Sequence, residues 1–460
     1  MIGRLAIRSL TAHPVRSAVL AAGFGAGVAV MAILLGVAQI VLEQSLAPAL
    51  VGGGDVLIRL APQVPARLLL SGTLQAETMR SRVAVAAPTH TTPLYLVRDG
   101  RATRIAARGG IPSLETALED DETTQVAAWR DTAADVEWTR DSPERVLREI
   151  DRFHQVPDAP AWGQSWAEWL YFNGRAADSR FYLTFLVGPK RPDGQRAAGV
   201  RLQLERDGRM ETYAEGAPIL EADALRAPDL TIGRNSVRLE GVRYHVSLDL
   251  PGPGGQRVRG TFTLDASAGR MLPPIEITGA RGWRSGYVVP VMSGPLGGEL
   301  VAGGTPISFA GGTGYHDHNW GFWKGVSWQW GQVQQGDVSF LYGRVFPPPD
   351  AADPERIPGF IGALGPDGPL GYATDVRILE QNDAQGQPRS IIVTGRGPSL
   401  NLRLQFDVGS VVTTRMEQGP LANGINFLQM RGAYSVSGRA GGRDLNFTAP
   451  GSAETFRGQK

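Results

Sequence analysis

The chain has 460 residues, with 46 Lys and Arg against 45 Asp and Glu and a formal net charge of +1. This balance, and the lack of a basic stretch interleaved with aromatic residues, argue against a nucleic-acid partner. The sequence contains no Cys, which excludes disulfide bonds, thiolate metal sites and cysteine nucleophiles. Because 460 residues exceed what a single core needs, we expect two or three domains.

The first predicted element is an apolar helix. Residues 17–42 carry no charged side chain and would extend about 39 Å as a helix, enough to cross roughly 30 Å of hydrocarbon. Arg4, Arg8 and Arg16 precede the run and Glu43 follows it. The positive-inside rule therefore predicts a single-pass protein of a bacterial-type inner membrane, with a cytoplasmic N-terminus and a periplasmic bulk. A cleaved signal peptide is the alternative, although the apolar run is longer than a typical signal-peptide core.

Residues 43–155 are predicted to form a mixed, membrane-proximal connector. Residues 56–58 and 94–97 are apolar runs typical of short strands. Residues 142–144, Ser-Pro-Glu, combine an N-cap residue, a proline for the first helical position and an acid for the first turn. The sequence therefore predicts a helix that begins after residue 142.

Beyond residue 157 the pattern is that of many short strands. Residues 181–187 form an uninterrupted apolar run, and residues 200–205 and 244–250 alternate apolar and polar side chains with a period of two. Turns rich in Gly, Pro and Asp separate these runs, and no helical period intervenes. This pattern over about 300 residues predicts antiparallel barrels, and a barrel of about eight strands can hold one small apolar ligand.

The stretch richest in chemically active side chains is residues 313–332. It holds two of the six histidines and four of the ten tryptophans. The alternation of a strand sends two sets of its side chains to opposite faces: His316, His318 and Trp320 to one, and Tyr315, Asp317 and Asn319 to the other.

Three interpretations of this stretch remain open. A His-x-His pair on one strand can supply two imidazoles to a metal ion, although a third ligand is not evident nearby. Tyr, His and Trp side chains with bonded polar tips can simply close the end of a barrel. A carboxyl group or imidazolium beside indole rings can also protonate an alkene, and the indoles can stabilise the resulting cation. Glu168 and Asp317 are a weaker candidate pair of carboxyl groups for hydrolysis.

Residues 315–321, Tyr-His-Asp-His-Asn-Trp-Gly, resemble the central motif of the hydroxyneurosporene synthase family (CrtC, carotenoid 1,2-hydratase), which includes AttH-type proteins. Residues 167–174 and 181–185 resemble its opening strands, although the family's Glu-Trp-Trp-Tyr is Glu-Trp-Leu-Tyr here. The resemblance spans about residues 160–460. It implies two lipocalin-like barrels joined end to end, with the motif near their junction and with no cofactor.

Residues 5–16 and the apolar run after them resemble the first membrane helix of MacB/FtsX-type ABC exporter permeases. No second apolar run is long enough to span a membrane, so we do not expect this chain alone to form a transport channel. AttH-type proteins are encoded with exporter parts, and the two resemblances together imply ABC transporter subunits as partners.

We therefore expect a mainly β protein, with two lipocalin-like antiparallel β-barrels in tandem preceded by one transmembrane helix and a mixed connector. The expected parts are a cytoplasmic N-terminus at 1–16, a transmembrane helix at 17–42, a connector at 43–155, a first lipocalin-like domain at 156–325 and a second at 326–460.

Two functional hypotheses follow. In the first, the protein is membrane-anchored and binds a hydrophobic, lipid or isoprenoid-like molecule as an accessory of an ABC-type exporter. In the alternative, it is a cofactor-independent hydro-lyase, isomerase or cyclase acting on a prenyl-like substrate. The resemblance matches Tyr342 to a Tyr of the hydratase site, but Gly343 and Arg344 follow it where the family has an Asp. The missing Asp and the permease-like helix favour the first hypothesis.

The candidate site has two sets of residues, and neither set includes a predicted metal ligand. For catalysis, His318 or Asp317 would donate a proton, Trp320 and Trp323 would stabilise positive charge, and Tyr315 or Tyr342 would orient water. The predicted ligand-binding residues are Tyr315, His316, Asn319, Trp323, Trp328, Trp330, Trp169 and Tyr171.

Overall fold

The computed structural model describes residues 83–99, 101–118, 129–139 and 142–457, apart from 178, 207, 268–270, 367 and 417–424, together with short segments before residue 83 (14–15, 18, 31, 56–60, 66–67 and 69–70). The chain divides into two units. Residues 1–59 and 85–139 form the first unit, and residues 60–84 and 140–460 form the second.

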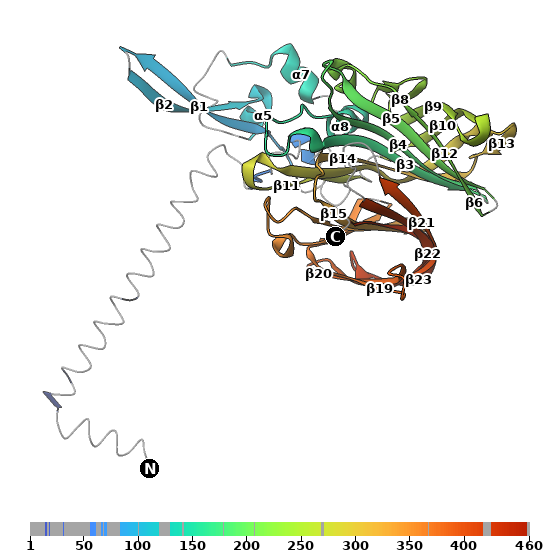
Figure 1. Cartoon of the computed structure of the whole chain (residues 1–460). Coiled ribbons are helices and arrows are strands. Elements are labelled where there is room, and N and C mark those ends of the chain that lie inside the picture. Colours follow the sequence, from blue (N-terminus) through green and yellow to red (C-terminus); the bar gives the residue numbers. More distant parts are fainter. Residues whose placement is uncertain are drawn as a thin grey trace. The chain divides into compact units, whose positions relative to one another are not determined.

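The first unit contains a two-stranded antiparallel hairpin, drawn in blue in Figure 1. Its elements are β1 (Thr89–Arg98), β2 (Arg101–Gly110), α5 (Pro112–Ala117) and α7 (Ala133–Thr139). The strand predicted at residues 94–97 is confirmed as part of β1. The strand predicted at residues 56–58 is wrong: the three apolar residues are exposed and have no regular structure, because no described strand pairs with them.

The membrane helix predicted at residues 17–42 lies outside the described residues, apart from Ala18 and Met31. Among the helices that the structure does describe, none combines the length and the apolar composition needed to cross a bilayer.

The second unit begins, after short described segments, with helix α8 (Pro143–Ile150). The Ser142 hydroxyl accepts a hydrogen bond from the backbone N–H of Arg145 at 3.3 Å, and Pro143 occupies the first helical position. The predicted helix start is thus confirmed. Val146 and Ile150 are buried in the core of the first sheet, and each such side chain stabilises the fold by roughly 1.5–3 kcal/mol.

The first large sheet has 12 strands, and ten of them follow the order β6-β5-β4-β3-β14-β12-β10-β9-β8-β7. β11 and β13 pair with the long β12. The sheet curls until β6 approaches β9. The strands are β3 (Trp166–Ala176), β4 (Ser179–Lys190), β5 (Arg196–Arg206), β6 (Arg209–Gly216), β7 (Leu230–Ile232), β8 (Asn235–Glu240), β9 (Arg243–Pro251), β10 (Arg257–Asp265), β11 (Leu272–Thr278), β12 (Arg284–Ala302), β13 (Thr305–Ser308) and β14 (Gly312–Phe322).

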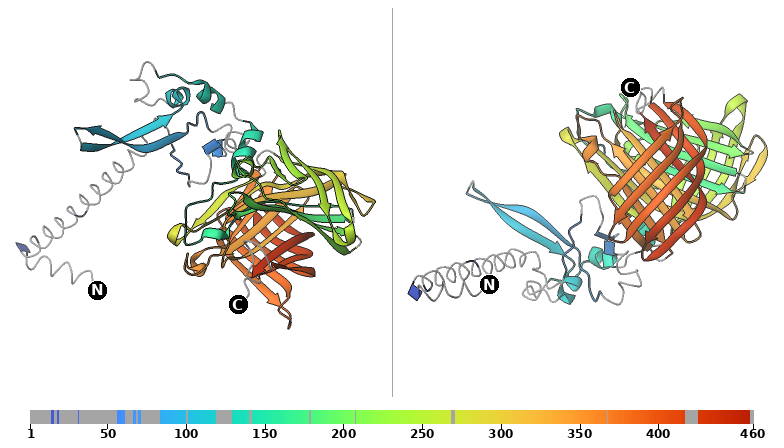
Figure 2. Two further views of the ribbon diagram at one scale, coloured as in Figure 1. Left: turned by 45° about the horizontal axis from the view of Figure 1, so that its top comes forward. Right: turned by 90° about the horizontal axis from the view of Figure 1, so that it is seen from below.

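The second sheet has nine strands in the order β18-β17-β16-β15-β23-β22-β21-β20-β19. Its two ends also meet, since β18 approaches β20 and β21. Figure 2 shows the tilted orange and red strands of this barrel. The strands are β15 (Ser327–Gln335), β16 (Val338–Phe346), β17 (Phe360–Gly365), β18 (Gly368–Ala373), β19 (Asp375–Asn382), β20 (Pro388–Gly397), β21 (Leu400–Met416), β22 (Ile425–Ala440) and β23 (Arg443–Arg457).

The remaining described helices are single turns. They are η2 (Gly163–Ser165), α9 (Glu221–Ala224), η3 (Pro253–Gly255), η4 (Ala280–Gly282) and η5 (Pro354–Arg356).

Side-chain alternation explains why these sheets close. In β9, for example, every second residue from Tyr244 to Leu250 is buried and those between are more exposed. Each curved sheet therefore encloses its own apolar core, one around residues such as Phe172 and Phe262 and the other around residues such as Leu404 and Phe406. The predicted fold class is confirmed in outline: the protein is mainly β, with two large antiparallel sheets in tandem that curl into barrels.

Candidate functional site

The candidate site is a cavity of about 900 Å³ between the outer faces of the two barrels. Trp169 and Tyr171 of β3 line it. Phe172, the next residue along the strand, points to the opposite side and packs edge-to-face against Tyr244 and Phe262 inside the first barrel. The strands around the cavity are β3–β6, β11, β12 and β14 of the first sheet and β15–β18, β22 and β23 of the second. Neither barrel's interior forms this cavity, which needs both sheets.

Aromatic rings form much of the cavity wall. Four tryptophans line it, and the rings of three of them contact one another: the centroids of Trp169 and Trp323 lie 4.6 Å apart, and those of Trp323 and Trp328 lie 5.4 Å apart. Trp330 donates its indole N–H to the hydroxyl of Tyr287 at 3.2 Å. Packed aromatic walls of this kind favour flat or elongated apolar ligands.

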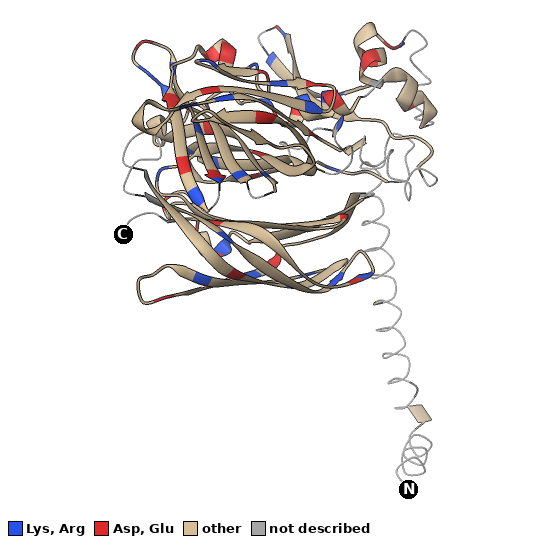
Figure 3. Ribbon diagram, turned by 90° about the vertical axis from the view of Figure 1, so that its right-hand side faces the viewer, with Lys and Arg blue, Asp and Glu red and all other residues tan. Residues whose placement is uncertain are grey.

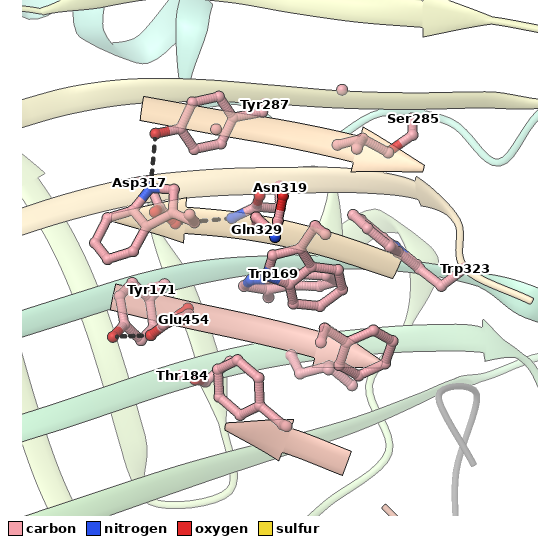
Figure 4. Close-up of a pocket in the computed structure, with 18 of the residues that line it drawn as sticks. Trp169, Tyr171, Thr184, Ser285, Tyr287, Asp317, Asn319, Trp323, Gln329 and Glu454 are labelled. Atoms are coloured by element: carbon pink, nitrogen blue, oxygen red, sulfur yellow. Dashed lines mark hydrogen bonds between the residues drawn. The ribbon is translucent and has the colours of Figure 1, made fainter. Parts of the chain in front are cut away.

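Two buried carboxyl groups stand in this apolar surrounding, Asp317 on β14 and Glu454 on β23 (Figure 4). Burial, with a contribution from the nearby Glu454, raises the pKa of Asp317 well above its usual value, although hydrogen bonds from Tyr315 (2.8 Å) and Asn319 (2.7 Å) oppose the shift. Burial likewise raises the pKa of Glu454 to about 7, against hydrogen bonds from Tyr171 (2.8 Å) and Gln429 (3.4 Å). The raised pKa of Asp317 favours its protonated form, which can act as an acid, and Glu454 is near its titration midpoint at neutral pH.

A second cluster lies on the opposite face of β14, inside the first barrel. His316 Nε2 lies 2.9 Å from Asp151 Oδ2, and His318 Nδ1 lies 3.3 Å from Asp151 Oδ1. His318 Nε2 lies 2.9 Å from Glu168 Oε1, and Glu168 also lies 2.6 Å from His154 Nδ1. The helix α8 places Asp151 just beyond its C-terminus, which explains how a residue of the predicted connector reaches this buried strand.

Charge pairing dominates this second cluster. Burial alone would lower the pKa of His318, but its bonds to Asp151 and Glu168 raise the pKa to about 9. Burial alone would raise the pKa of Asp151, but His316 and His318 hold it at about 2. For Glu168, the bonds from His154 and His318 outweigh burial and lower the pKa. His318 is therefore an imidazolium between two carboxylates, fully buried in the first barrel.

The cluster bears on the metal-binding interpretation of the His-x-His pair. Donor atoms of His154, Glu168 and His318 lie within 4.8 Å of one another, so the carboxylate ligand that the sequence did not reveal is present. However, the 2.6 and 2.9 Å separations around Glu168 are hydrogen-bond distances, and an ion at this point would have to displace the proton of His318. This arrangement is that of a hydrogen-bonded ion network.

The structure divides the predicted site residues between these two places. The cavity is lined by Asp317, Asn319, Trp323, Trp328, Trp330, Trp169 and Tyr171. Tyr315 is buried behind that wall, bonded to Asp317 and 3.1 Å from the hydroxyl of Tyr287. His316 and His318 face the interior of the first barrel.

Trp320 and Tyr342 also point away from the cavity. The Trp320 ring stacks on His154 at 4.5 Å and lies over Gly286 of β12, and its N–H donates to Glu276 at 3.1 Å. Tyr342 lies in the core of the second barrel, with its hydroxyl 3.2 Å from that of Tyr434. The weaker candidate pair also separates, because Glu168 belongs to the imidazole cluster and Asp317 to the cavity.

The acids and histidines of these sites that sequence reasoning missed include Glu454, Asp151 and His154. Glu454 comes from the last strand, and only the pairing of β23 with β15 brings it to the cavity. Asp151 and His154 follow α8 in the predicted connector. An acid directly after an amphipathic helix was the one available signal for Asp151.

A comparison with protein-family models finds no match, and no curated protein matches the chain. Among solved structures, the chain is similar to CghA crystallised with Sch210972, with 14% identity, a TM-score of 0.44, and coverage of 69% of this chain and 94% of CghA. It is also similar to a protein provisionally assigned as AttH from Nitrosomonas europaea, with 15% identity, a TM-score of 0.40, and coverage of 66% of this chain and 98% of that protein. These likenesses are low, and no family membership follows from them.

Proposed function

We propose that the protein binds a hydrophobic small molecule in the cavity between its two barrels. The observation that carries this proposal is the cavity itself: about 900 Å³ lined largely by apolar and aromatic side chains. Sites for small molecules occupy roughly 300–1,000 Å³ and have this kind of lining, with a few polar groups that orient the ligand.

The polar groups of the cavity support the same proposal. Gln429 is buried, and its Oε1 has no hydrogen-bond partner among the described residues. An unpaired buried acceptor costs about 1–3 kcal/mol, so a ligand with a donor group at this point would gain affinity by pairing with it.

Filling the cavity tests the proposal. Thr184 of β4 lines the cavity, so Thr184→Trp should occupy the ligand volume and weaken binding of the neutral dye N-phenyl-1-naphthylamine by about tenfold or more. The matched control is Thr261→Trp, because Thr261 is exposed on β10. Dye fluorescence titrations measure both variants. Equal dye affinity in wild type and Thr184→Trp, with both folded, would contradict the proposal.

A second candidate function is proton-initiated chemistry on an unsaturated substrate: hydration, isomerisation or cyclisation. The observation that favours it is the pair Asp317 and Glu454, in which burial raises the pKa of Asp317 well above its usual value and that of Glu454 to about 7. In a hydration, Asp317 would transfer its proton to an alkene carbon, water would bond to the resulting cation, and Glu454 would accept the proton that the water loses. The tryptophan faces would stabilise the cation.

The isosteric variant Asp317→Asn distinguishes catalysis from binding alone. Under the catalytic function it retains dye binding and loses turnover by a factor of about 10² or more, because the proton donor is gone. The assay is incubation of acyclic prenyl compounds in heavy water, with mass spectrometry of deuterium incorporation. Incorporation that is equal in wild type and variant would contradict a role for Asp317.

We also propose, from the sequence alone, that residues 17–42 anchor the chain in a bacterial inner membrane with its bulk outside the cytoplasm, where it serves an ABC-type exporter. The run of uncharged residues and the arginines before it support this orientation. A phosphatase reporter fused after residue 460 should be active only outside the cytoplasm. Recovery of the full-length chain in the soluble fraction would contradict the anchor.

A further inference from the structure

Four cavity-lining residues form one row across four neighbouring strands. In the strand register, Arg201 of β5 pairs with Thr184 of β4, Thr184 with Tyr171 of β3, and Tyr171 with Asp317 of β14. Residues directly opposite in adjacent strands point to the same face, and all four line the cavity. Three strand spacings separate the ends of the row, roughly 14 Å along the sheet.

One end of the row carries a cation without an acidic partner. The guanidinium of Arg201 donates one hydrogen bond, to the Thr414 hydroxyl at 3.1 Å, and no described carboxylate lies within ion-pair distance of it. Burial lowers the pKa of Arg201, which reflects the poor solvation of its charge. A partly desolvated cation whose hydrogen-bond partner is a neutral hydroxyl lacks the negative charge that would offset its desolvation.

The other cations around this junction differ from Arg201. Arg344, which also lines the cavity, lies 3.5 Å from Glu355. Arg431 forms an ion pair with Glu205, two strand residues beyond Gln203. Figure 3 shows acidic and basic positions interspersed along the strands of both sheets, so the incomplete pairing of Arg201 is local and does not belong to a general basic surface.

The opposite end of the row disfavours an anion. Asp317 is held there beside Glu454, whose carboxyl group accepts a hydrogen bond from Tyr171. The two acids already disfavour each other's charge, and a third negative group would add to that repulsion. The cavity is therefore polarised along the row, with a cation at Arg201 and acids and indoles toward the other end.

We propose that the ligand is an elongated monoanionic amphiphile, whose carboxylate pairs with Arg201 and whose apolar chain extends along the row toward Asp317 and the tryptophans. One guanidinium matches one negative charge, and its planar donor pair fits a carboxylate. This inference rests on the proposed binding function and adds the chemical class and the orientation of the ligand.

The test compares two compounds with the same acyl chain, dodecanoate, which is charged, and its neutral methyl ester. Both compete with N-phenyl-1-naphthylamine at about pH 7.5, where the fatty acid is ionised in water. For the wild-type full chain, the acid should displace the dye at a concentration at least about tenfold lower than the ester. Arg201→Met should abolish this preference while keeping ester competition. Arg201→Gln serves as the second variant should the methionine disturb folding.

The control variant is Arg403→Met, because Arg403 is exposed on β21 and does not line the cavity. It should keep the wild-type preference for the acid. Equal potency of acid and ester in wild type would overturn the inference. So would a preference for the acid that survives in both Arg201 variants. Either result would leave the binding function standing. Failure of the dye and of both competitors to bind would instead overturn the binding function itself.

Discussion

Glu454 shows how strongly its place in the fold changes a single carboxyl group. It lies on the last strand, buried at the junction of two barrels, and no lysine or arginine pairs with it among the described residues. Burial therefore raises its pKa from 4.5 to about 7 despite two hydrogen bonds. Because the native state holds the proton more tightly than the unfolded chain, protonation of Glu454 stabilises the fold.

This difference predicts a pH dependence of stability. The contribution of Glu454 is complete below pH 4.5 and is lost as the pH rises to about 7, at about 1.4 kcal/mol per pH unit or about 3 kcal/mol in all. Glu454→Gln, which cannot ionise, should lack this loss, so its free energy of unfolding should improve relative to wild type across that range. Urea unfolding at several pH values measures the effect.

The matched control is Glu355→Gln, at a glutamate whose side chain is 84% exposed. It should follow the wild-type pH profile. If the free energy of unfolding changed with pH in the same way for wild type and Glu454→Gln, the raised pKa of Glu454 would be contradicted.

Residue-level prediction from the sequence succeeded where neighbours in the chain define the chemistry. Asp317 and Trp169 were expected at the site and line the cavity. Glu454 was missed because its strand resembles any other alternating strand, and its environment comes from β15 and β22, which are distant in the sequence. Long-range pairing, which local pattern does not encode, decides which acid is desolvated.

At the scale of one element, β14 serves two sites with its two faces. The period of two correctly separated His316 and His318 from Tyr315 and Asp317. It could not tell which face borders the cavity, since both faces carry residues able to do acid–base chemistry. The structure resolves this through neighbouring elements: α8 supplies Asp151 to one face, and β23 supplies Glu454 to the other.

The division of β14 predicts separable effects. His318→Gln should lower the free energy of unfolding by about 3 kcal/mol or more, because it leaves Asp151 and Glu168 buried without their cation. The loss should be largest below pH 6.5 and should shrink as the pH rises through about 9, where wild-type His318 itself loses its proton. Dye affinity of the folded variant should stay unchanged.

His245→Gln is the control, since the side chain of His245 on β9 is 42% exposed and does not line the cavity. Denaturant unfolding and dye titration, done on the same preparations, check both parts. A large loss of dye affinity in folded His318→Gln, with little loss of stability, would instead place His318 in the ligand site and support the catalytic role predicted for it.

At the scale of the whole second unit, the cavity exists only while two barrels stay joined. Polar contacts cross the junction, including Tyr171 to Glu454, Gln332 to Asn173 at 3.1 Å, and the ion pair between Arg431 of β22 and Glu205 of β5. The repetition of short strands predicted two barrels. It did not predict that the outer faces of the barrels enclose the cavity. Apolar side chains on an outer face covered by a second barrel alternate along the strand in the same way as those of a barrel interior.

The junction ion pair can be tested by a double-mutant cycle. Arg431→Met should destabilise the protein by about 2 kcal/mol, less than for a fully enclosed pair, because Arg431 is about one-third exposed and Glu205 is buried. It should also weaken dye binding, since β5 and β22 both line the cavity. Adding Glu205→Gln should recover part of the stability. Additive losses in the cycle would mean that the two side chains do not interact.

The contact between Trp320 and Gly286 has an evolutionary consequence. A Cβ at residue 286 would lie 2.1 Å from the indole ring, so the two strands tolerate the large side chain only opposite the smallest. Natural sequences with this architecture should therefore change the two positions together: a lineage that replaces the tryptophan becomes free to replace the glycine, and a lineage that keeps it does not. Covariation at 286 and 320 would record that constraint in an alignment.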